Sequence, residues 1–239
     1  MSSFLTLGTI QTALELGIIY SLVALALFLS FSMLNVCDLS TDSCFTLGCA
    51  VGSTVAIAGH PILAIFAAMA AGILSGYITA LLQTKLGVES ILAGIIVNTG
   101  LYTINIFIMG KSILNLNTTT TVFTLAKDLL ADTPLADWSR LIVALLFVAI
   151  ITILLALFLH TRLGLSIRAT GDNEDMVKAS SINPSLTIIV GLCVANAMTA
   201  LSGCLLGEYQ KSCDINMGTG MVTIALASLI IGETLLGRG

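Results

Sequence analysis

Asp38 and Asp42 are the residues whose type and place in the chain most directly suggest chemistry. They lie in the segment CDLSTDSCFTLGCAVG, which begins at Cys37, where an apolar run gives way to polar residues. An ionisable residue at membrane depth is costly and is therefore a functional candidate. The alternative is that both aspartates sit in an aqueous loop. We expect Asp38 to line a polar cavity and Asp42 to cap the N-terminus of the next apolar helix, where negative charge is favourable.

The same pair could be catalytic, but the pattern does not favour this. A spacing of four residues would place both carboxylates on one helix face, whereas a membrane aspartyl protease takes its two aspartates from different helices. The chain has no H-E-x-x-H motif and no G-x-x-x-x-G-K-[ST] phosphate-binding loop. We therefore expect neither an enzyme nor a bound cofactor.

Three asparagines within apolar stretches, Asn98, Asn105 and Asn196, are further candidates for contact with a polar ligand. Asn98 and Asn105 are seven residues apart, so they share one helix face. Such side chains more often form hydrogen bonds between membrane helices than bind a substrate. Glu208 and Glu233 lie near the ends of apolar runs, where contact with water is expected.

The six cysteines predict neither a metal site nor disulfides. They form no C-x-x-C pair, and no histidine stands near them at the spacing of a metal ligand. Most of them lie in apolar runs, where a cysteine is a small apolar residue. The cysteines are Cys37, Cys44, Cys49, Cys193, Cys204 and Cys213.

Much of the charge of the chain is concentrated in the segment from Arg162 to Ser185, RLGLSIRATGDNEDMVKASSINPS. We expect the segment to contain a short helix of about two turns, with acidic residues in its first turn and Asn183-Pro184 after it. In this interpretation Gly171 breaks the preceding structure and Asp172 is the N-cap. Such a helix could present one side to a partner protein. The segment could equally be an ordinary solvated connector between two spans. The candidate residues are Gly171, Asp172, Asn173, Glu174, Asp175, Met176, Val177 and Lys178.

The elements that carry these residues follow from composition. Hydrophobic residues make up 57% of the chain and charged residues 9%, against roughly 45–50% and 25% in soluble domains. Because a helix satisfies its own backbone groups in lipid, this composition predicts an all-α, polytopic transmembrane helical bundle. A net charge of −4 without a basic patch argues against nucleic-acid binding.

Apolar runs predict about seven membrane spans. In the third span, small residues recur at every fourth position from Ala68 to Ala80, which predicts close packing against another helix. Lysines and arginines are divided almost evenly between the two sides, so the positive-inside rule does not fix the orientation. The predicted spans are Leu16–Cys37, Ser43–Gly59, Pro61–Leu82, Ser90–Gly110, Leu141–Leu159, Leu186–Leu206 and Gly218–Leu236.

Three segments resemble the permease subunits of bacterial ABC importers, in the branched-chain amino acid, ribose and nucleoside permease superfamily. They are DLSTDSCFTLGCAV, KLGVESILAGIIVNTGLYTINIFIMGKS and GLSIRATGDNEDMVKASSINPS. The resemblance extends from Leu14 to Gly237, and its specific part is the pattern G-L-x-x-R-A-x-G-x-N-x-x-M. Within the superfamily, the chain looks most like permeases of the tryptophan/tyrosine type or uncharacterised ones. Members usually continue beyond the G-E-x-L-x-G segment, so the C-terminal helices of the family are expected to be missing here.

The resemblance implies a single permease domain over residues 1–239, in the cytoplasmic (inner) membrane of a bacterium. It would import a small solute by alternating access, driven by a separate ABC ATPase. The other implied partners are an extracytoplasmic substrate-binding protein, a second permease copy in a homodimer or heterodimer, and membrane lipid. The segment from Gly171 to Ile182 would be the helix that couples to the ATPase, which places Arg162–Pro184 inside and Lys111–Asp137 outside. The path candidates are then Asp38, Asp42, Asn98, Asn105 and Asn196.

The sequence leaves alternatives open for the solute and for the transport class. An amino acid, aromatic ones included, is the implied solute, while sugars and nucleosides stay open. The rival class is an ion-coupled secondary transporter or channel, which would need inverted repeats and a charged site at the membrane midplane. The sequence shows no convincing repeat and no charge in the middle of a span.

Overall fold

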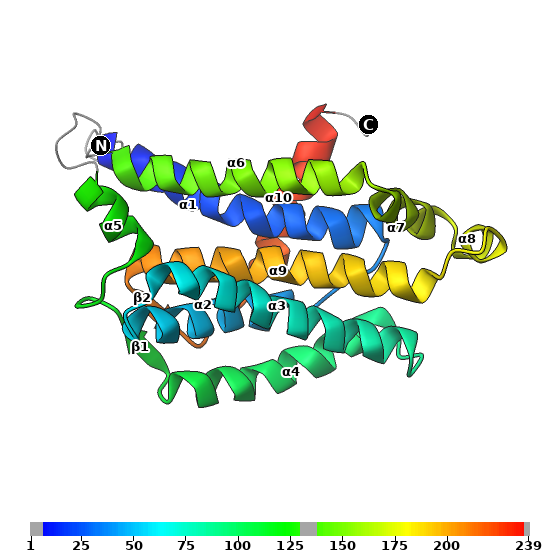
Figure 1. Cartoon of the computed structure of the whole chain (residues 1–239), viewed down its shortest axis with the longest axis horizontal. Helices are drawn as coiled ribbons and strands as arrows, with labels where there is room; N and C mark the ends of the chain where they lie inside the picture. The colour runs from blue at the N-terminus through cyan, green and yellow to red at the C-terminus, as the bar shows by residue number, and fades with distance from the viewer. Residues whose placement is uncertain (1–6, 130–137, 237–239) are drawn as a thin grey trace.

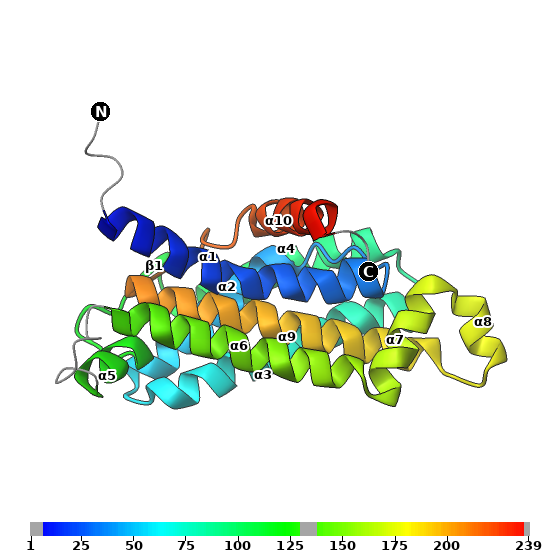
Figure 2. The same ribbon diagram turned by 90° about the horizontal axis from the view of Figure 1, so that it is seen from above.

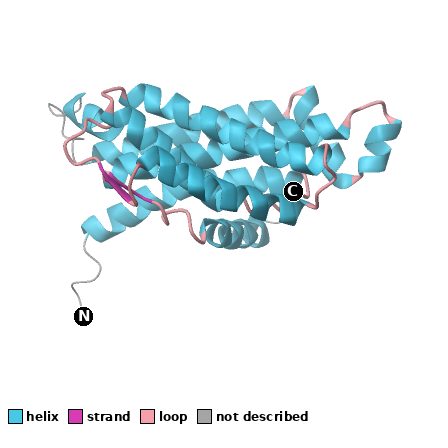
Figure 3. Ribbon diagram, turned by 90° about the horizontal axis from the view of Figure 1, so that it is seen from below, coloured by secondary structure: helices cyan, strands magenta, loops and turns pink. Residues whose placement is uncertain are grey.

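The computed structural model describes residues 7–129 and 138–236. This part of the chain is almost entirely helical, with one pair of short antiparallel strands (Figure 3). The predicted all-α bundle is therefore confirmed. The elements are α1 Leu7–Leu27, the π-helix η1 Phe28–Met33, α2 Thr41–Ile57, α3 Pro61–Thr84, α4 Ser90–Met109, β1 Ile113–Asn115, α5 Val122–Leu129, α6 Ser139–Leu159, α7 Arg162–Asp172, α8 Glu174–Ala179, α9 Pro184–Gln210, β2 Ser212–Asp214 and α10 Met221–Leu236.

Five helices in the described residues are long and apolar enough to cross a membrane. They run side by side along the long axis of the molecule (Figure 1). The two other predicted spans form α2 and α10, which have 17 and 16 residues within the described part of the chain, against roughly 20 in a typical crossing. The five spans are Gly8–Met33, Pro61–Thr84, Ser90–Met109, Ser139–Leu159 and Pro184–Gln210.

The central helix of the bundle is α9, which packs against α1, α2 and α3. The small-residue face predicted in the third span makes one of these contacts. A Cβ atom at Gly72 or Gly76 would collide with the backbone carbonyl groups of Asn196 or Leu192. The close approach of α3 to α9 therefore requires glycine at both positions, as the spacing predicted.

Two segments interrupt the helical pattern and return into the bundle. After η1 the chain turns back as an irregular segment before α2 begins at Thr41 (Figure 1). Asp38, in this segment, contacts Asn196, which lies near the middle of α9. After β2 a second irregular segment, residues 215–220, leads to the start of α10. Non-helical backbone at membrane depth is tolerated where it is buried in protein or lines a cavity.

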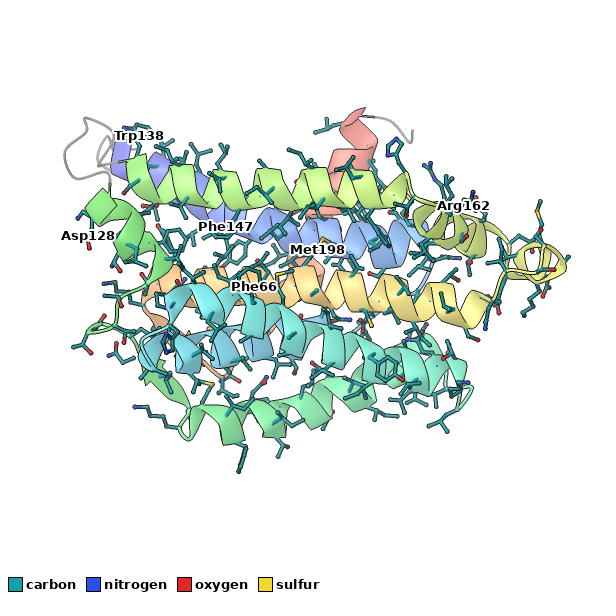
Figure 4. The ribbon with its side chains drawn as sticks, viewed as in Figure 1. Phe66, Asp128, Trp138, Phe147, Arg162 and Met198 are labelled. Atoms are coloured by element: carbon teal, nitrogen blue, oxygen red, sulfur yellow. The ribbon has the colours of Figure 1, made fainter. Side chains whose placement is uncertain are left out.

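The two ends of the bundle carry different structures. The short helices α7 and α8 project from one end, and α5 with the two strands lies at the other (Figure 1). Helix α6 joins the ends, with Trp138 before its first residue and Arg162 just beyond its last turn (Figure 4). Helix α10 lies on the outside of the bundle beside α1 (Figure 2).

Candidate functional site

A polar cavity of about 270 Å³ lies where α2 begins. Its walls come from the first turns of α2, from the middle of α4 and from the irregular segment before α10. Hydroxyl, amide and carboxylate groups dominate this lining. The lining residues are Asp42, Ser43, Thr46, Asn98, Thr99, Tyr102, Ile215 and Thr219.

Asp42 connects two helices at this cavity. Its Oδ2 accepts a hydrogen bond from the backbone N–H of Gly220 at 3.0 Å, and its Oδ1 accepts one from Val222 at 2.9 Å. The expectation that Asp42 caps α2 is wrong. Ser40 holds the N-cap position of α2, and Asp42 lies in the first turn, while its carboxylate caps α10 instead. The negative charge therefore lies at the N-termini of both helices, where the helix dipoles favour it.

The sequence predicted that Asp38 lines a polar cavity. Asp38 does not line this cavity. Its side chain is only 2% exposed. Its Oδ1 accepts the N–H of Ser40 at 2.8 Å, and its Oδ2 accepts Nδ2–H of Asn196 at 2.8 Å. Oδ2 therefore holds the irregular segment against α9, while Oδ1 fixes the turn within the segment itself.

Asn98 and Asn105 both bind the backbone of Ser43. The N–H of Ser43 donates to Oδ1 of Asn98 at 3.0 Å, and Nδ2 of Asn105 donates to the Ser43 carbonyl at 3.0 Å. The hydroxyl of Ser43 also donates to the Asn98 carbonyl at 2.8 Å. The interhelical hydrogen bonding expected of these asparagines is thus present. Asn98 lines the cavity in addition, whereas Asn105 is buried beside it.

The sequence reasoning missed five polar residues of the cavity wall. One of them carried a usable signal, because Tyr102 follows Asn98 by four residues and so shares its helix face. Thr219 carried none, since only the return of its segment into the bundle brings it to the cavity. The missed residues are Ser43, Thr46, Thr99, Tyr102 and Thr219.

The short charged helix exists, but its cap differs from the expected one. Asn173, not Asp172, is the N-cap of α8, because its Oδ1 accepts the N–H of Met176 at 3.0 Å. Asp172 is the last residue of α7, a helix that the sequence interpretation did not anticipate, and Gly171 lies within that helix instead of breaking it. The expected position of the acidic residues in the first turn is confirmed, and Lys178 lies in the last turn.

The surface of α8 combines one exposed apolar side chain with a charged face. Met176 is 70% exposed, whereas the next residue, Val177, is buried. The Lys178 ammonium lies 3.0 Å from Glu174 and 3.5 Å from Asp175. The hydrogen bond with Glu174, supported by the charge of Asp175, raises the pKa of Lys178. These pairs are exposed, so they contribute little to stability.

Helix α7 ties α8 to the membrane bundle through a close contact. A Cβ atom at Gly171 would collide with the backbone carbonyl of Met33, in η1. On the other side of α7, the hydroxyls of Thr170 and Thr187 are 2.8 Å apart, which joins α7 to the first turns of α9. A displacement of α7 and α8 therefore bears directly on the end of α1 and on α9.

The comparison with protein families gives a match over nearly the whole chain. Residues 9–238 match the family described as the permease component of the branched-chain amino acid transport system. No solved structure gives a significant match.

Three relatives illustrate the range of the family. A tyrosine transport system permease protein of Clostridioides difficile is 34% identical over 223 residues, which cover 93% of this chain and 72% of the relative. An uncharacterised protein of Rickettsia prowazekii is 31% identical, with 93% and 76% covered. The ribose import permease protein of Escherichia coli is 26% identical, with 99% and 73% covered. The chain therefore belongs to the branched-chain amino acid permease family and is a multi-pass membrane permease component.

Proposed function

We propose that this chain is the transmembrane subunit of an ATP-binding-cassette importer in the cytoplasmic (inner) membrane of a bacterium. A separate ATPase would drive the import, an extracytoplasmic binding protein would deliver the solute, and a second permease copy would complete the pore within the lipid. Family membership supports the class. The observation that carries the proposal is the projection of α7 and α8 beyond one end of the membrane-spanning bundle (Figure 1).

The docking surface for the ATPase is the segment 171–178, which comprises the end of α7, the cap residue Asn173 and most of α8. The exposed thioether of Met176 offers an apolar anchor, and Glu174, Asp175 and Lys178 surround it with charge. A large apolar side chain within a polar rim is the usual arrangement of an interface hot spot. This assignment makes the α8 end of the bundle cytoplasmic, and it places Lys85 and Lys178 inside and Lys127 outside.

The solute path passes the polar cavity at Asp42 and Asn98. Hydroxyls and amides suit a small polar solute, and discontinuous helices that begin inside a bundle commonly form such sites in transporters. An amino acid is the proposed solute class, with aromatic amino acids included. One relative, named as a tyrosine transport permease, supports this class.

Met176→Asp tests the proposal in vesicles that contain the permease, the ATPase and the binding protein. A carboxylate in place of the thioether cannot fill an apolar pocket, so we expect at least a tenfold loss of solute-stimulated ATP hydrolysis and of uptake. The matched control is Leu86→Asp, a position that is 71% exposed in the turn after α3 at the same end of the bundle. Normal coupling in Met176→Asp would refute the docking surface, and uptake driven by an ion gradient without ATP would refute the transport class.

A further inference from the structure

A second polar cavity, of about 260 Å³, lies at the end of the bundle opposite α8. Four helices meet around it: the first turns of α1, α5, the start of α6 and the end of α9. Trp138 and Asp128 mark this end of the molecule in Figure 4. The cavity shares no lining residue with the one at Asp42. Its charged lining residues are Glu15, Lys127 and Arg140, with Gln11 and Tyr209 between them.

Glu15 is a buried carboxylate with no cationic partner among the described residues. Its side chain is only 3% exposed. The hydroxyl of Tyr209 donates to its Oε2 at 2.7 Å, and Nε2 of Gln11 donates to its Oε1 at 3.0 Å. Among the described residues, no lysine or arginine nitrogen lies within 4.0 Å of it. Neutral donors thus hold the carboxylate in place, and no cation within 7–129 or 138–236 is paired with it.

The positive charges of the cavity come from two other helices. Arg140, in the first turn of α6, places its guanidinium 5.8 Å from the ring centroid of Tyr209. Lys127 lies in the last turn of α5. Tyr209 therefore separates a negative group on one side from a positive group on the other, and both line the same empty volume.

Opposite charges that line one cavity without touching form a receptor for a dipolar ligand. A buried charge is costly unless it is paired and hydrogen-bonded, and a ligand that carries both signs would pair each group with its opposite. The cavity is smaller than the roughly 300–1,000 Å³ of pockets that hold drug-sized ligands. Its size therefore suits a small molecule or a headgroup.

We propose that this cavity binds a zwitterion with a primary ammonium and an oxyanion. The ammonium lies against the carboxylate of Glu15, and the oxyanion lies toward Arg140 and Lys127, whose N–H groups form charge-assisted hydrogen bonds with it. Two sources share this chemistry, a free amino acid and the headgroup of phosphatidylethanolamine. The site is separate from the path proposed above, so a failure at one leaves the other standing.

Trp138 offers a direct readout, because it is the single tryptophan of the chain and directly precedes Ser139 and Arg140. The full chain is placed in nanodiscs of phosphatidylcholine, and its fluorescence is followed during titration with L-leucine. Two half-molecules are the ligand controls, 4-methylpentanoate without the ammonium and 3-methylbutylamine without the carboxylate. In a second arm, nanodiscs contain increasing fractions of phosphatidylethanolamine.

We expect a saturable change with leucine or with phosphatidylethanolamine, and none with either half-molecule. A response to leucine assigns the site to free amino acids, and a response to phosphatidylethanolamine alone assigns it to the lipid headgroup. Glu15→Gln, Arg140→Gln and Lys127→Gln should each weaken binding about tenfold. The control is Lys111→Gln, an exposed lysine at the same end outside the cavity.

Because Glu15 is buried, its replacement could disturb the fold. The variants of the exposed residues Arg140 and Lys127 therefore provide the decisive test. Three results would overturn the proposal. The first is no response to either probe. The second is equal binding of a half-molecule. The third is unchanged binding in both Arg140→Gln and Lys127→Gln.

Discussion

The carboxylate of Asp42, in the first turn of α2, accepts the backbone N–H groups of Gly220 and Val222 at the start of α10. From this point α2 runs toward the end with the strands (Figure 1), and α10 reaches η1, where the hydroxyl of Ser32 donates to Glu233 at 2.6 Å. Two shorter helices thus begin inside the bundle. At the start of α10, the carboxylate of Asp42 accepts backbone N–H groups that lipid could not satisfy.

Asp42→Asn should destabilise the protein measurably. As a cap of α2 alone, asparagine would be a good substitute, but here two oxygens accept two N–H groups, and an amide offers only one oxygen. The amide NH₂ would then face a backbone donor. We expect a loss of roughly 1.5–3 kcal/mol, the size of a hydrogen bond to a charged group, measured by thermal unfolding in detergent.

The control for this change is Asp214→Asn. The carboxylate of Asp214 accepts one N–H, that of Asn216, at 2.8 Å in an exposed turn, so a surface change within about 0.5 kcal/mol is expected. Equal stability of Asp42→Asn and the unmodified protein would show that the contact between α2 and α10 is dispensable.

Asn105→Leu should weaken the packing of α4 on α2. The change removes the donor to the Ser43 carbonyl, and hydrogen bonds of this kind between membrane helices contribute about 0.6 kcal/mol, with a maximum of about 1.7. Unfolding in detergent measures the loss, and Thr103→Leu, an exposed position on the same helix, is the control. Uptake per folded molecule should stay normal, because Asn105 does not line the cavity. Reduced uptake at full stability would contradict this structural role.

Local signals in the sequence predicted part of this arrangement. The spacing of Asn98 and Asn105 predicted a shared helix face, and both residues do bond across to α2. The acidic first turn predicted the start of α8 to within a residue or two. The expected stop at Asn183-Pro184 is wrong, because α8 ends at Ala179 and Asn183-Pro184 begins α9. Such features depend on residues that are neighbours in the chain, so propensity and capping rules capture them.

The contacts that the sequence could not predict join distant segments. Nothing near Asp42 in the chain indicates that its partners are Gly220 and Val222, because the contact arises only when two irregular segments return to the same depth. Glu208 is a similar case. It was expected near water at a span end, yet it is completely buried, because α5 folds back over the end of α9 and supplies a donor.

Gly171→Ala should disturb coupling more than it disturbs folding. The added methyl group would collide with the Met33 carbonyl, so α7 must move away from η1 and carry α8 with it. We expect a several-fold loss of solute-stimulated ATP hydrolysis in vesicles, with insertion in the membrane preserved. Gly100→Ala is the control, because no atom lies within 4 Å of a Cβ there, and alanine should favour the helix by about 0.5–1 kcal/mol. Normal coupling in Gly171→Ala would mean that the position of α7 is not critical.

Glu208→Ala should release α5 from the bundle. Oε2 of Glu208 accepts the N–H of Val122, the first residue of α5, at 2.7 Å. Alanine leaves that donor without an acceptor, at a cost of roughly 1–3 kcal/mol, whereas Glu208→Gln keeps an oxygen of the same reach. Hydrogen exchange of the α5 amides should therefore quicken in Glu208→Ala and change little in Glu208→Gln.

The exposed Glu89, at the opposite end of α4 from the strands, supplies the control Glu89→Ala, for which unchanged exchange in α5 is expected. Because α5 also contributes Lys127 to the second polar cavity, its release should weaken zwitterion binding there without altering the Asp42 contact. Equal exchange rates in Glu208→Ala and the unmodified protein would show that packing of Phe123 against Tyr209, whose ring centroids are 5.7 Å apart, holds α5 without the carboxylate.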